Sequence, residues 1–366
     1  MSAVTKTEVT PLETLVKPSS AVATFDEQPL WRRALFATAA YAVCLVLFAG
    51  FAAWQGADPF TIFPTMLDFS VLDWGTLQQT LVRSVPIVLA ALACAVPARA
   101  GLVNVGGEGQ IMIGAVAAIG TGLALGSSVG GPFAWVLIVL AATVAAGVWS
   151  GICGWLRVWL NTSESVTTLF FNFIAADIML FTIYDVWRQK GGSDIPQSRP
   201  LTSDQMLPML PGLQLNVSVP IMLAVVVVVW FLLHHTGWGF SLRVAGGNSQ
   251  AAYRAGLPVR SLLLSAMVVG GAVAGLGGAL NVMSVEGALR PGMTAAFGYV
   301  AFLANFLGGS KPFAVLGAAF LFSAIANSGN GLQLVEGLPG SVVNVLLGLI
   351  VMTLLVVSGR RKGAQQ

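Results

Sequence analysis

Asn104 and Glu108 are the residues of this sequence whose types and spacing most clearly indicate chemistry. They stand in the segment GLVNVGGEGQIMIGA (101–115), where an amide and a carboxylate lie among five glycines before a long apolar run. A carboxylate near a helix start can accept bonds from exposed amides, which stabilises its charge by about 0.3–1 kcal/mol. Glu108 is therefore expected to pair with amides at the start of a helix from Gln110 onward. Two interpretations stand: the pair braces an irregular backbone, or it forms an inner gate that lines a solute route.

Composition decides which solvent surrounds this segment. Of 366 residues, 56% are hydrophobic and 9% are charged, and the mean hydropathy is +0.83. A soluble domain carries roughly a quarter charged residues. The chain is therefore predicted to be an integral membrane protein, and its small net charge of +3 gives no basic stripe for nucleic acid.

Metal and catalytic sites are not expected. Cys44, Cys94 and Cys153 lie far apart inside apolar runs, and the adjacent His234 and His235 end another run. None of these residues has metal-ligand spacing. No cluster of His, Asp and Glu suits hydrolysis, so we predict no catalytic residue, no metal and no cofactor of the chain's own.

Apolar runs long enough to cross a bilayer alternate with polar breaks along the chain. A hydrocarbon core of about 30 Å needs roughly 20 residues as helix, and this length gives about ten spans. They are 34–54, 77–97, 102–125, 133–156, 165–186, 218–236, 261–283, 294–308, 312–328 and 341–358. The polar residues 1–33 are expected to form a disordered cytoplasmic tail, and 359–366 a second one, with the transmembrane domain over 34–358.

Lys and Arg in the short loops indicate the orientation. With the N-terminus inside, basic residues such as Arg99, Arg157 and Lys311 fall on the cytoplasmic side, whereas the first outer loop has Asp but no Lys or Arg. The long segment 187–217 is then periplasmic, and both chain ends are cytoplasmic.

The residue types of the inner loop 237–260 predict a short helix. Asn248 can cap the stretch SQAAYRA, and Gly256 can end it in the left-handed conformation. Two turns of surface helix would then display Gln250, Tyr253 and Arg254 to the cytoplasm. Either this is an ordinary loop with a helical turn, or it docks a cytoplasmic partner.

Amides inside the spans are costly in lipid unless they pair with other helices or face a pathway. Asn172 stands among Phe171 and other aromatic and hydroxyl residues, and Asn305 lies in the eighth span. Amides with aromatics suit a neutral, flat, hydrogen-bonding solute better than an ion. Helix-to-helix hydrogen bonding is the alternative for each Asn.

The motifs of this chain include no energy source for moving a solute uphill. It has no G-x-x-x-x-G-K-[ST] phosphate-binding loop. Ion-coupled carriers usually keep several ionisable residues at membrane depth, and few are present here. Both observations favour energy delivered by another subunit.

Several stretches together resemble one family. GLVNVGGEGQIMIGA looks like the hallmark segment of permease subunits of bacterial ABC importers, in the nucleoside and simple-sugar branch of the branched-chain amino acid/ribose permease family. WSGICGWLRVWLNTSESVTTLFFNFIA, IPQSRPLTSDQMLPMLPG, GWGFSLRVAGGNSQAAYRAGLPVRS and GYVAFLANFLGGSKPFAVLGAAFLFSAIANSG are similar to further parts of that branch. The resemblance covers about residues 75 to 358.

The resemblance implies an all-α, ten-helix permease fold like that of cobalamin-type (type II-like) importers. It implies a second permease subunit, ABC ATPase subunits that bind the ATP, and a periplasmic or lipid-anchored solute-binding protein, all at the bacterial inner membrane. Residues 246–256 would be the coupling helix, where Asn248, Gln250, Tyr253 and Arg254 serve the contact with the ATPase. Asn104, Glu108, Phe171, Asn172 and Asn305 are the expected substrate path.

Nucleosides or nucleobases are the predicted solutes. A simple sugar carried by the same machinery is the nearest alternative. A stand-alone ion-coupled carrier or passive channel is a second, and a purely structural membrane scaffold a third. The intramembrane Asn and Glu residues disfavour the scaffold.

Overall fold

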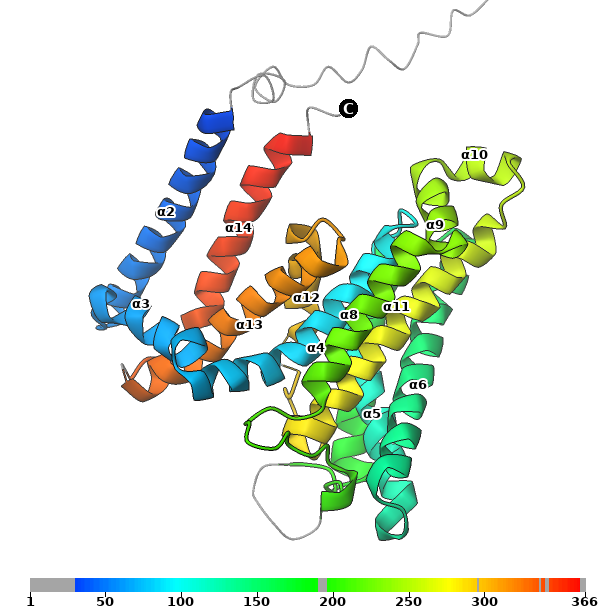
Figure 1. Cartoon of the computed structure of the whole chain (residues 1–366), viewed down its shortest axis with the longest axis horizontal. Coiled ribbons are helices and arrows are strands. Elements are labelled where there is room, and N and C mark those ends of the chain that lie inside the picture. Colours follow the sequence, from blue (N-terminus) through cyan, green and yellow to red (C-terminus); the bar gives the residue numbers. More distant parts are fainter. Residues whose placement is uncertain (1–29, 190–195, 295, 336, 340–341, 363–366) are drawn as a thin grey trace, which may run out of the picture. The chain divides into compact units, whose positions relative to one another are not determined.

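The computed structural model describes residues 30–189, 196–294, 296–335, 337–339 and 342–362 (Figure 1). Over these residues the chain is helical, with two isolated bridges, Arg188–Ser198 and Met209–Asn216, and no strand. The predicted all-α class is confirmed. The chain divides into two compact units, residues 1–60 with 340–366 and residues 61–339, which are described separately.

The first unit pairs the two ends of the chain. Its helices α2 (Leu30–Trp54) and α14 (Val342–Lys362) pack against each other, and apolar side chains such as Val43 and Leu349 line a shallow groove along them. Of the two predicted tails, residues 1–29 and 363–366 lie outside the described residues. Residues 30–33 form the first turn of α2, and α14 continues through Lys362.

The second unit contains the remaining helices. The chain enters it through α3 (Pro59–Leu67), whose first residues belong to the first unit, and a π-helical turn, η2 (Asp68–Leu72). The helices that follow are α4 (Trp74–Ala98), α5 (Gly107–Leu125), α6 (Gly131–Leu160), α7 (Glu164–Phe181), α8 (Ser218–His235), α9 (Gly237–Gly247), α10 (Ser249–Arg254), α11 (Val259–Asn281), α12 (Phe297–Leu307) and α13 (Pro312–Val335).

Seven helices within the described residues are long and apolar enough to cross a membrane, which makes the chain a multi-pass membrane protein. They are α4, α5, α6, α7, α8, α11 and α13, and α7 and α11 are lengthened by π-helical turns at 182–186 and 282–286. The other three predicted spans coincide with α2, α14 and the 11-residue α12. The count of ten spans stays a prediction.

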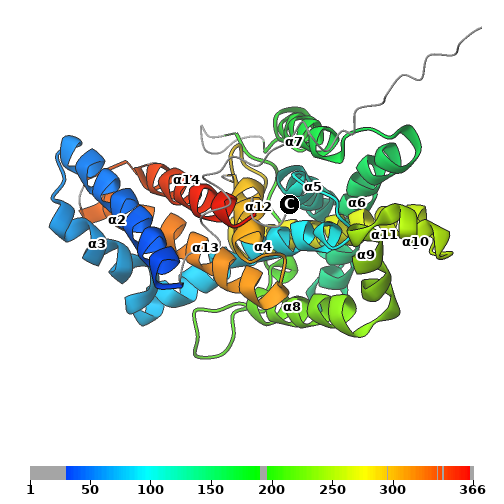
Figure 2. The same ribbon diagram turned by 90° about the horizontal axis from the view of Figure 1, so that it is seen from above.

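Helix α11 is the central helix of the second unit. It packs against α4, α5 and α6, and Figure 2 shows it beside α4 with α8 on one side and α5 to α7 on the other. A Cβ added at Gly271 would lie 2.3 Å from the Cβ of Ser150, and one at Gly275 would lie 2.4 Å from that of Ala146. Small residues at Gly271 and Gly275 thus allow α11 and α6 to pack closely.

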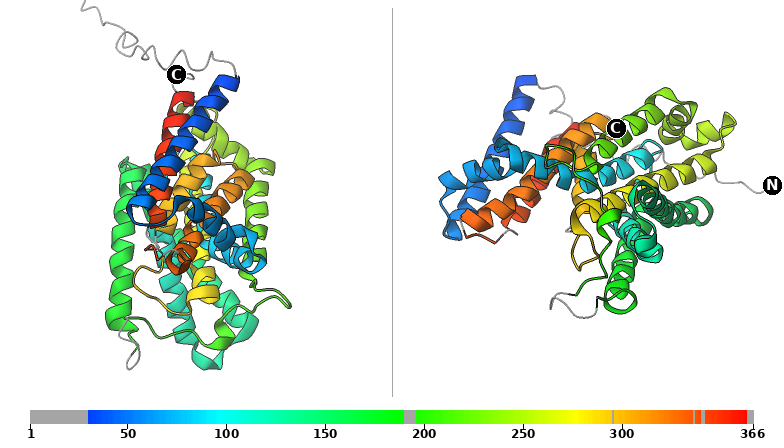
Figure 3. Two further views of the ribbon diagram at one scale, coloured as in Figure 1. Left: turned by 90° about the vertical axis from the view of Figure 1, so that its left-hand side faces the viewer. Right: turned by 60° about the horizontal axis from the view of Figure 1, so that its bottom comes forward.

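The two ends of the second unit differ in structure. Helices α9 and α10 lie at one end, and residues 187–189 and 196–217 of the segment 187–217 lie at the other (Figures 1 and 3). Within this segment, residues 190–195 lie outside the described residues. The predicted inner loop 237–260 contains α10 as expected, but its first half is a further helix, α9, which the glycine-rich sequence GWGFSLRVAGG concealed.

Candidate functional site

The glycine-rich segment is not helical over its first residues. The predicted span 102–125 begins as helix only at Gly107, and residues 99–106 connect α4 and α5 without helix, as a turn at 99–101 and irregular backbone over 102–106. A Cβ at Gly107 would lie 3.8 Å from that of Ala90, which stands eight residues before Ala98 and so about 12 Å along α4. Helix α5 therefore begins near the middle of a hydrocarbon core of about 30 Å.

Asn104 holds the irregular segment against α4 and α5 directly, and against α6 and α11 through Gln110. Its side chain is 1% exposed, and its Nδ2 donates to the Ala93 carbonyl at 3.2 Å. The amides of Asn104 and Gln110 pair with each other at 3.1 and 3.2 Å. Gln110 also donates to the Ser150 hydroxyl, which donates to the Met267 carbonyl at 2.8 Å. The predicted bracing of the backbone by Asn104 is present in this state.

Asn172 of α7 fastens the same segment from the other side. Its Oδ1 accepts from the Gly109 amide at 2.9 Å, and its Nδ2 donates to the Val105 carbonyl at 3.0 Å. The Thr168 hydroxyl accepts from the Val105 amide at 3.2 Å. Both hydrogen bonds of the Asn172 side-chain amide go to main-chain groups, because irregular backbone at membrane depth needs hydrogen-bond partners inside the protein.

An ion pair lies at the N-terminal end of the segment. The Glu164 carboxylate accepts from the Val103 amide at 3.3 Å and pairs with the Arg157 guanidinium at 3.2 Å. Nearby, Arg99 donates to the Ser310 carbonyl at 3.0 Å. Burial of the Arg99 guanidinium, and secondly the positive charge of Arg243, lower the pKa of Arg99 from its ordinary value.

Glu108 binds a different helix from the one that was predicted. Its side chain is 4% exposed, and its carboxylate accepts from the Thr294 hydroxyl at 2.5 Å and from the Gly298 amide at 2.6 Å. Gly298 lies in the first turn of α12, so Glu108 caps α12 rather than its own helix. The prediction that Glu108 binds a backbone amide at a helix start was right, but the predicted helix was wrong. Helix α5 begins at Gly107 and already includes Glu108, so the amide belongs to α12.

Phe171 and Asn305 complete the predicted path and lie apart from these networks. The Phe171 ring is tilted against that of Trp149, with centroids 4.9 Å apart, and packs on the buried cluster of Leu102, Cys153 and Met267. Asn305 of α12 is 7% exposed, and its Oδ1 has no hydrogen-bond partner among the described residues. The role of all five residues as a substrate path stays a prediction.

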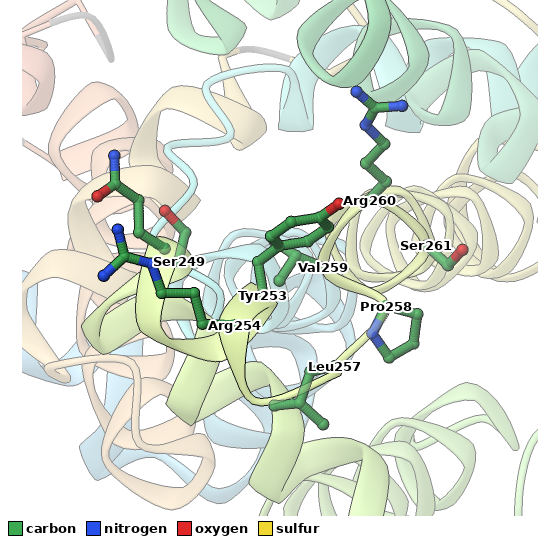
Figure 4. A pocket seen from close by; sticks show the side chains of 9 residues that line it. Ser249, Tyr253, Arg254, Leu257, Pro258, Val259, Arg260 and Ser261 are labelled. Atoms are coloured by element: carbon green, nitrogen blue, oxygen red, sulfur yellow. The ribbon is translucent and has the colours of Figure 1, made fainter.

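The predicted coupling residues gather on α10. Asn248 accepts from the Ala251 amide at 2.9 Å and Gly256 has φ of +83°, so the predicted cap and stop are confirmed. Gln250 and Arg254 are exposed, and Tyr253 is 75% exposed. A hollow of about 740 Å³ lies between α10 and the start of α11, and Figure 4 shows Tyr253 there between Arg254 and Arg260.

Sequence reasoning missed the partners that complete these networks. Gln110, Ser150, Thr168 and Thr294 are all buried and bonded to the segment or to Glu108. Gln110 follows Glu108 by two residues and Thr168 precedes Asn172 by four, so these two had a local signal. The others lie 40 or more residues away in sequence.

The arrangement can hold a broken backbone in the membrane and present a helix to a partner at one end. Among the described residues, no group of three or more His, Cys, Asp and Glu side chains could hold a metal ion. Among the buried polar side chains of the described residues, Glu108 is the charged one, and its carboxylate is bonded to the α12 segment.

Known proteins are similar in sequence to this chain over most of its length. The family model described as branched-chain amino acid transport system / permease component matches residues 76–357. A glucose ABC transporter permease of Haloferax volcanii is 29% identical over 309 residues, covering 81% of this chain and 80% of its own length. A guanosine ABC transporter permease of Bacillus subtilis is 29% identical, covering 75% and 79%. A nucleoside ABC transporter permease of Lactococcus lactis is 27% identical, covering 77% and 79%.

The matched range 76–357 includes the segment around Glu108, α10 and α12 together. The chain belongs to the family of branched-chain amino acid transport system permease components, and it is the membrane-spanning permease type of subunit and not an ATPase.

Proposed function

We propose that this chain is the translocation subunit of an ATP-driven importer for nucleosides or nucleobases, in the cytoplasmic membrane with both termini inside. The observation that carries the proposal is α10, an exposed two-turn helix beside a hollow at the end of the second unit opposite the outer loop. A partner ABC subunit would bind the ATP and dock there, since the sequence has no phosphate-binding loop of its own.

Further partners follow from the same proposal. A second permease subunit, identical or homologous, would complete the pathway in a ten-helix, cobalamin-type arrangement. A periplasmic or lipid-anchored solute-binding protein would deliver the solute to the outer face. The guanosine and nucleoside permeases among the relatives support a nucleoside, as does a path of amide and aromatic side chains.

The docking site is tested by a charge reversal on α10. Arg254→Glu should remove the ATPase subunit from a pull-down of the permease and abolish uptake of labelled guanosine. Arg199→Glu, the same charge change on an exposed residue of the outer segment, should leave the ATPase in the pull-down. Full ATPase binding and full uptake by the Arg254→Glu complex would refute the docking site.

The energy source is tested in liposomes. The complete complex should take up guanosine only when ATP is present on the side of the liposome membrane that carries the ATPase subunit. Robust gradient-driven uptake by the permease alone, without nucleotide, would refute the proposal and support a stand-alone carrier.

A simple sugar is the second candidate solute. The glucose permease of Haloferax volcanii, which is as similar as the guanosine permease, favours it. Competition decides between them: excess unlabelled adenosine should suppress guanosine uptake, whereas glucose and ribose should not. Suppression by the sugars alone would assign the chain to sugar import.

A further inference from the structure

The segment that leads into α12 is bound to the outer loop. The Ser198 amide donates to the Leu289 carbonyl at 3.0 Å, and the Leu289 amide donates to the Ser198 hydroxyl at 2.9 Å. The Leu201 amide donates to the Gly287 carbonyl at 2.8 Å. Ser198 and Leu289 are fully buried, whereas Arg199 and Arg290 beside them are exposed on the outer face. A protein that docks on this face can therefore contact residues that are hydrogen-bonded to the segment leading into α12.

The same segment is bound to α5 at mid-membrane. The Thr294 hydroxyl and the Gly298 amide both donate to Glu108, and all three residues are buried. Helix α12 has 11 residues and is thus about 16 Å long, about half of the hydrocarbon core. Helix α12 runs from this junction to the cytoplasmic side. The amides of its first turn therefore lie deep in the membrane, where only protein groups can accept their hydrogen bonds.

The far end of α12 is bound to the ATPase-docking side. Arg99 donates to the Ser310 carbonyl in the turn after α12. The backbone of Arg99 also packs against α9, because a Cβ at Gly246 would lie 2.4 Å from the Arg99 carbonyl oxygen. Gly246 stands two residues before Asn248, which caps α10. Arg99 thus contacts both the turn after α12 and the end of α9, the helix that directly precedes the docking helix α10.

We propose that the α12 segment, defined as residues 287–294 and 296–310, transmits receptor docking at the outer face to the docking helix α10. Thr294 is a positioning residue that holds this segment to α5. The proposal rests on the proposed function and adds the route by which the two faces communicate. Coupling between distant sites is carried by contiguous packed elements with discrete arrangements, and the contacts at Ser198, Thr294 and Arg99 join such an element at its outer end, middle and inner end.

The test compares ATP hydrolysis by the reconstituted permease–ATPase complex with and without guanosine-loaded receptor. Thr294→Val keeps the shape of the side chain but removes the hydroxyl that donates to Glu108. We expect the receptor-stimulated part of hydrolysis and guanosine uptake to fall at least tenfold, while assembly and unstimulated hydrolysis stay within twofold of the wild type. Thr294→Ser restores the hydroxyl and should restore stimulation.

A matched control and a second contact make the test decisive. Thr143→Val removes a hydroxyl that donates within its own helix, to Val139, and should change nothing. Ser198→Ala loosens the outer contact and should lower stimulation as well. The double variant with Thr294→Val should be no worse than the more severe single variant, since both act on one route.

Three outcomes would overturn the proposal. The first is stimulation by Thr294→Val within twofold of the wild type. The second is additive losses in the double variant, which would indicate two separate routes. The third applies if the Thr294→Val complex fails to assemble: it is full receptor stimulation of ATP hydrolysis by the Ser198→Ala complex. A wild-type complex that shows no ATP-dependent guanosine uptake would instead refute the proposed function, and it is measured first.

Discussion

Gly298→Ala should separate α12 from α5 at mid-membrane. The added Cβ would lie 2.0 Å from the Glu108 amide nitrogen, 2.4 Å from its Cα and 2.5 Å from the Gly107 carbonyl carbon. All three are backbone atoms, so no side-chain rotation relieves the contact. Ordinary van der Waals separation begins near 3.4 Å, and reaching it requires the two backbones to move apart by about 1.4 Å.

This movement acts on the cap as well as on the packing. The hydrogen bond from the Gly298 amide to Glu108 is 2.6 Å long, and the same displacement along it would exceed hydrogen-bond distance. Overpacking costs about 1–3 kcal/mol, and losing a hydrogen bond to a carboxylate costs about 1.5–3 kcal/mol. The expected destabilisation is therefore about 2.5–6 kcal/mol in total.

The assay is thermal unfolding of the purified permease in detergent, together with guanosine uptake by the reconstituted complex. The midpoint should fall by about 5–15 °C, and uptake should fall with it. Gly317→Ala is the matched control, because Gly317 lies in α13 with nothing within 4 Å of the added Cβ. That change should be neutral or raise the midpoint slightly. A Gly298→Ala protein with the midpoint and uptake of the wild type would refute the close junction between α5 and α12.

Three further changes test the networks around this junction. Glu108→Gln keeps the side-chain shape and one acceptor oxygen, so the midpoint should stay within about 3 °C of the wild type while guanosine uptake falls; unchanged uptake would leave Glu108 only a bracing role. Asn172→Ala removes two bonds to buried backbone and should cost about 2–4 kcal/mol in unfolding free energy, whereas Phe173→Leu, on the exposed side of the same helix, should cost under about 1 kcal/mol. Arg157→Gln should cost under about 1 kcal/mol, because the Arg157 side chain that pairs with Glu164 is 36% exposed and solvent screens the ion pair; a double-mutant cycle with Glu164→Gln measures the coupling energy of the pair, and a coupling well above about 1 kcal/mol would contradict this screening.

The position of every long apolar helix followed from the sequence. The spans predicted at 77–97, 133–156 and 218–236 correspond to α4, α6 and α8, with ends that differ by a few residues. Length and hydropathy are enough here, because lipid admits only helices or closed barrels. The cap at Asn248 and the left-handed Gly256 were also predictable, since both depend on residues within one short stretch.

The partner of Glu108 was not predictable in the same way. A carboxylate beside glycines indicates a bond to free amides, but which amides depends on how helices far apart in sequence pack. Thr294 and Gly298 lie 186 and 190 residues away from Glu108. Helix α9 was missed for a different reason: its four glycines in 11 residues argue against a helix by propensity, and packing of Gly239 and Gly246 against neighbouring backbone outweighs that preference.

The bonds in this state also rank the predicted path residues by how readily each could meet a solute. Asn104 and Asn172 would have to release main-chain groups that lack water at this depth, and a solute amide or hydroxyl could take their place at little net cost. Glu108 would have to leave the α12 amide at Gly298, whose charge-assisted bond is harder to replace with a neutral solute. Asn305 has nothing to release at its Oδ1. Contact with solute is therefore expected first at Asn305, so Asn305→Ala should raise the KM for guanosine more than it lowers the midpoint of unfolding, and the reverse pattern would assign Asn305 to helix packing.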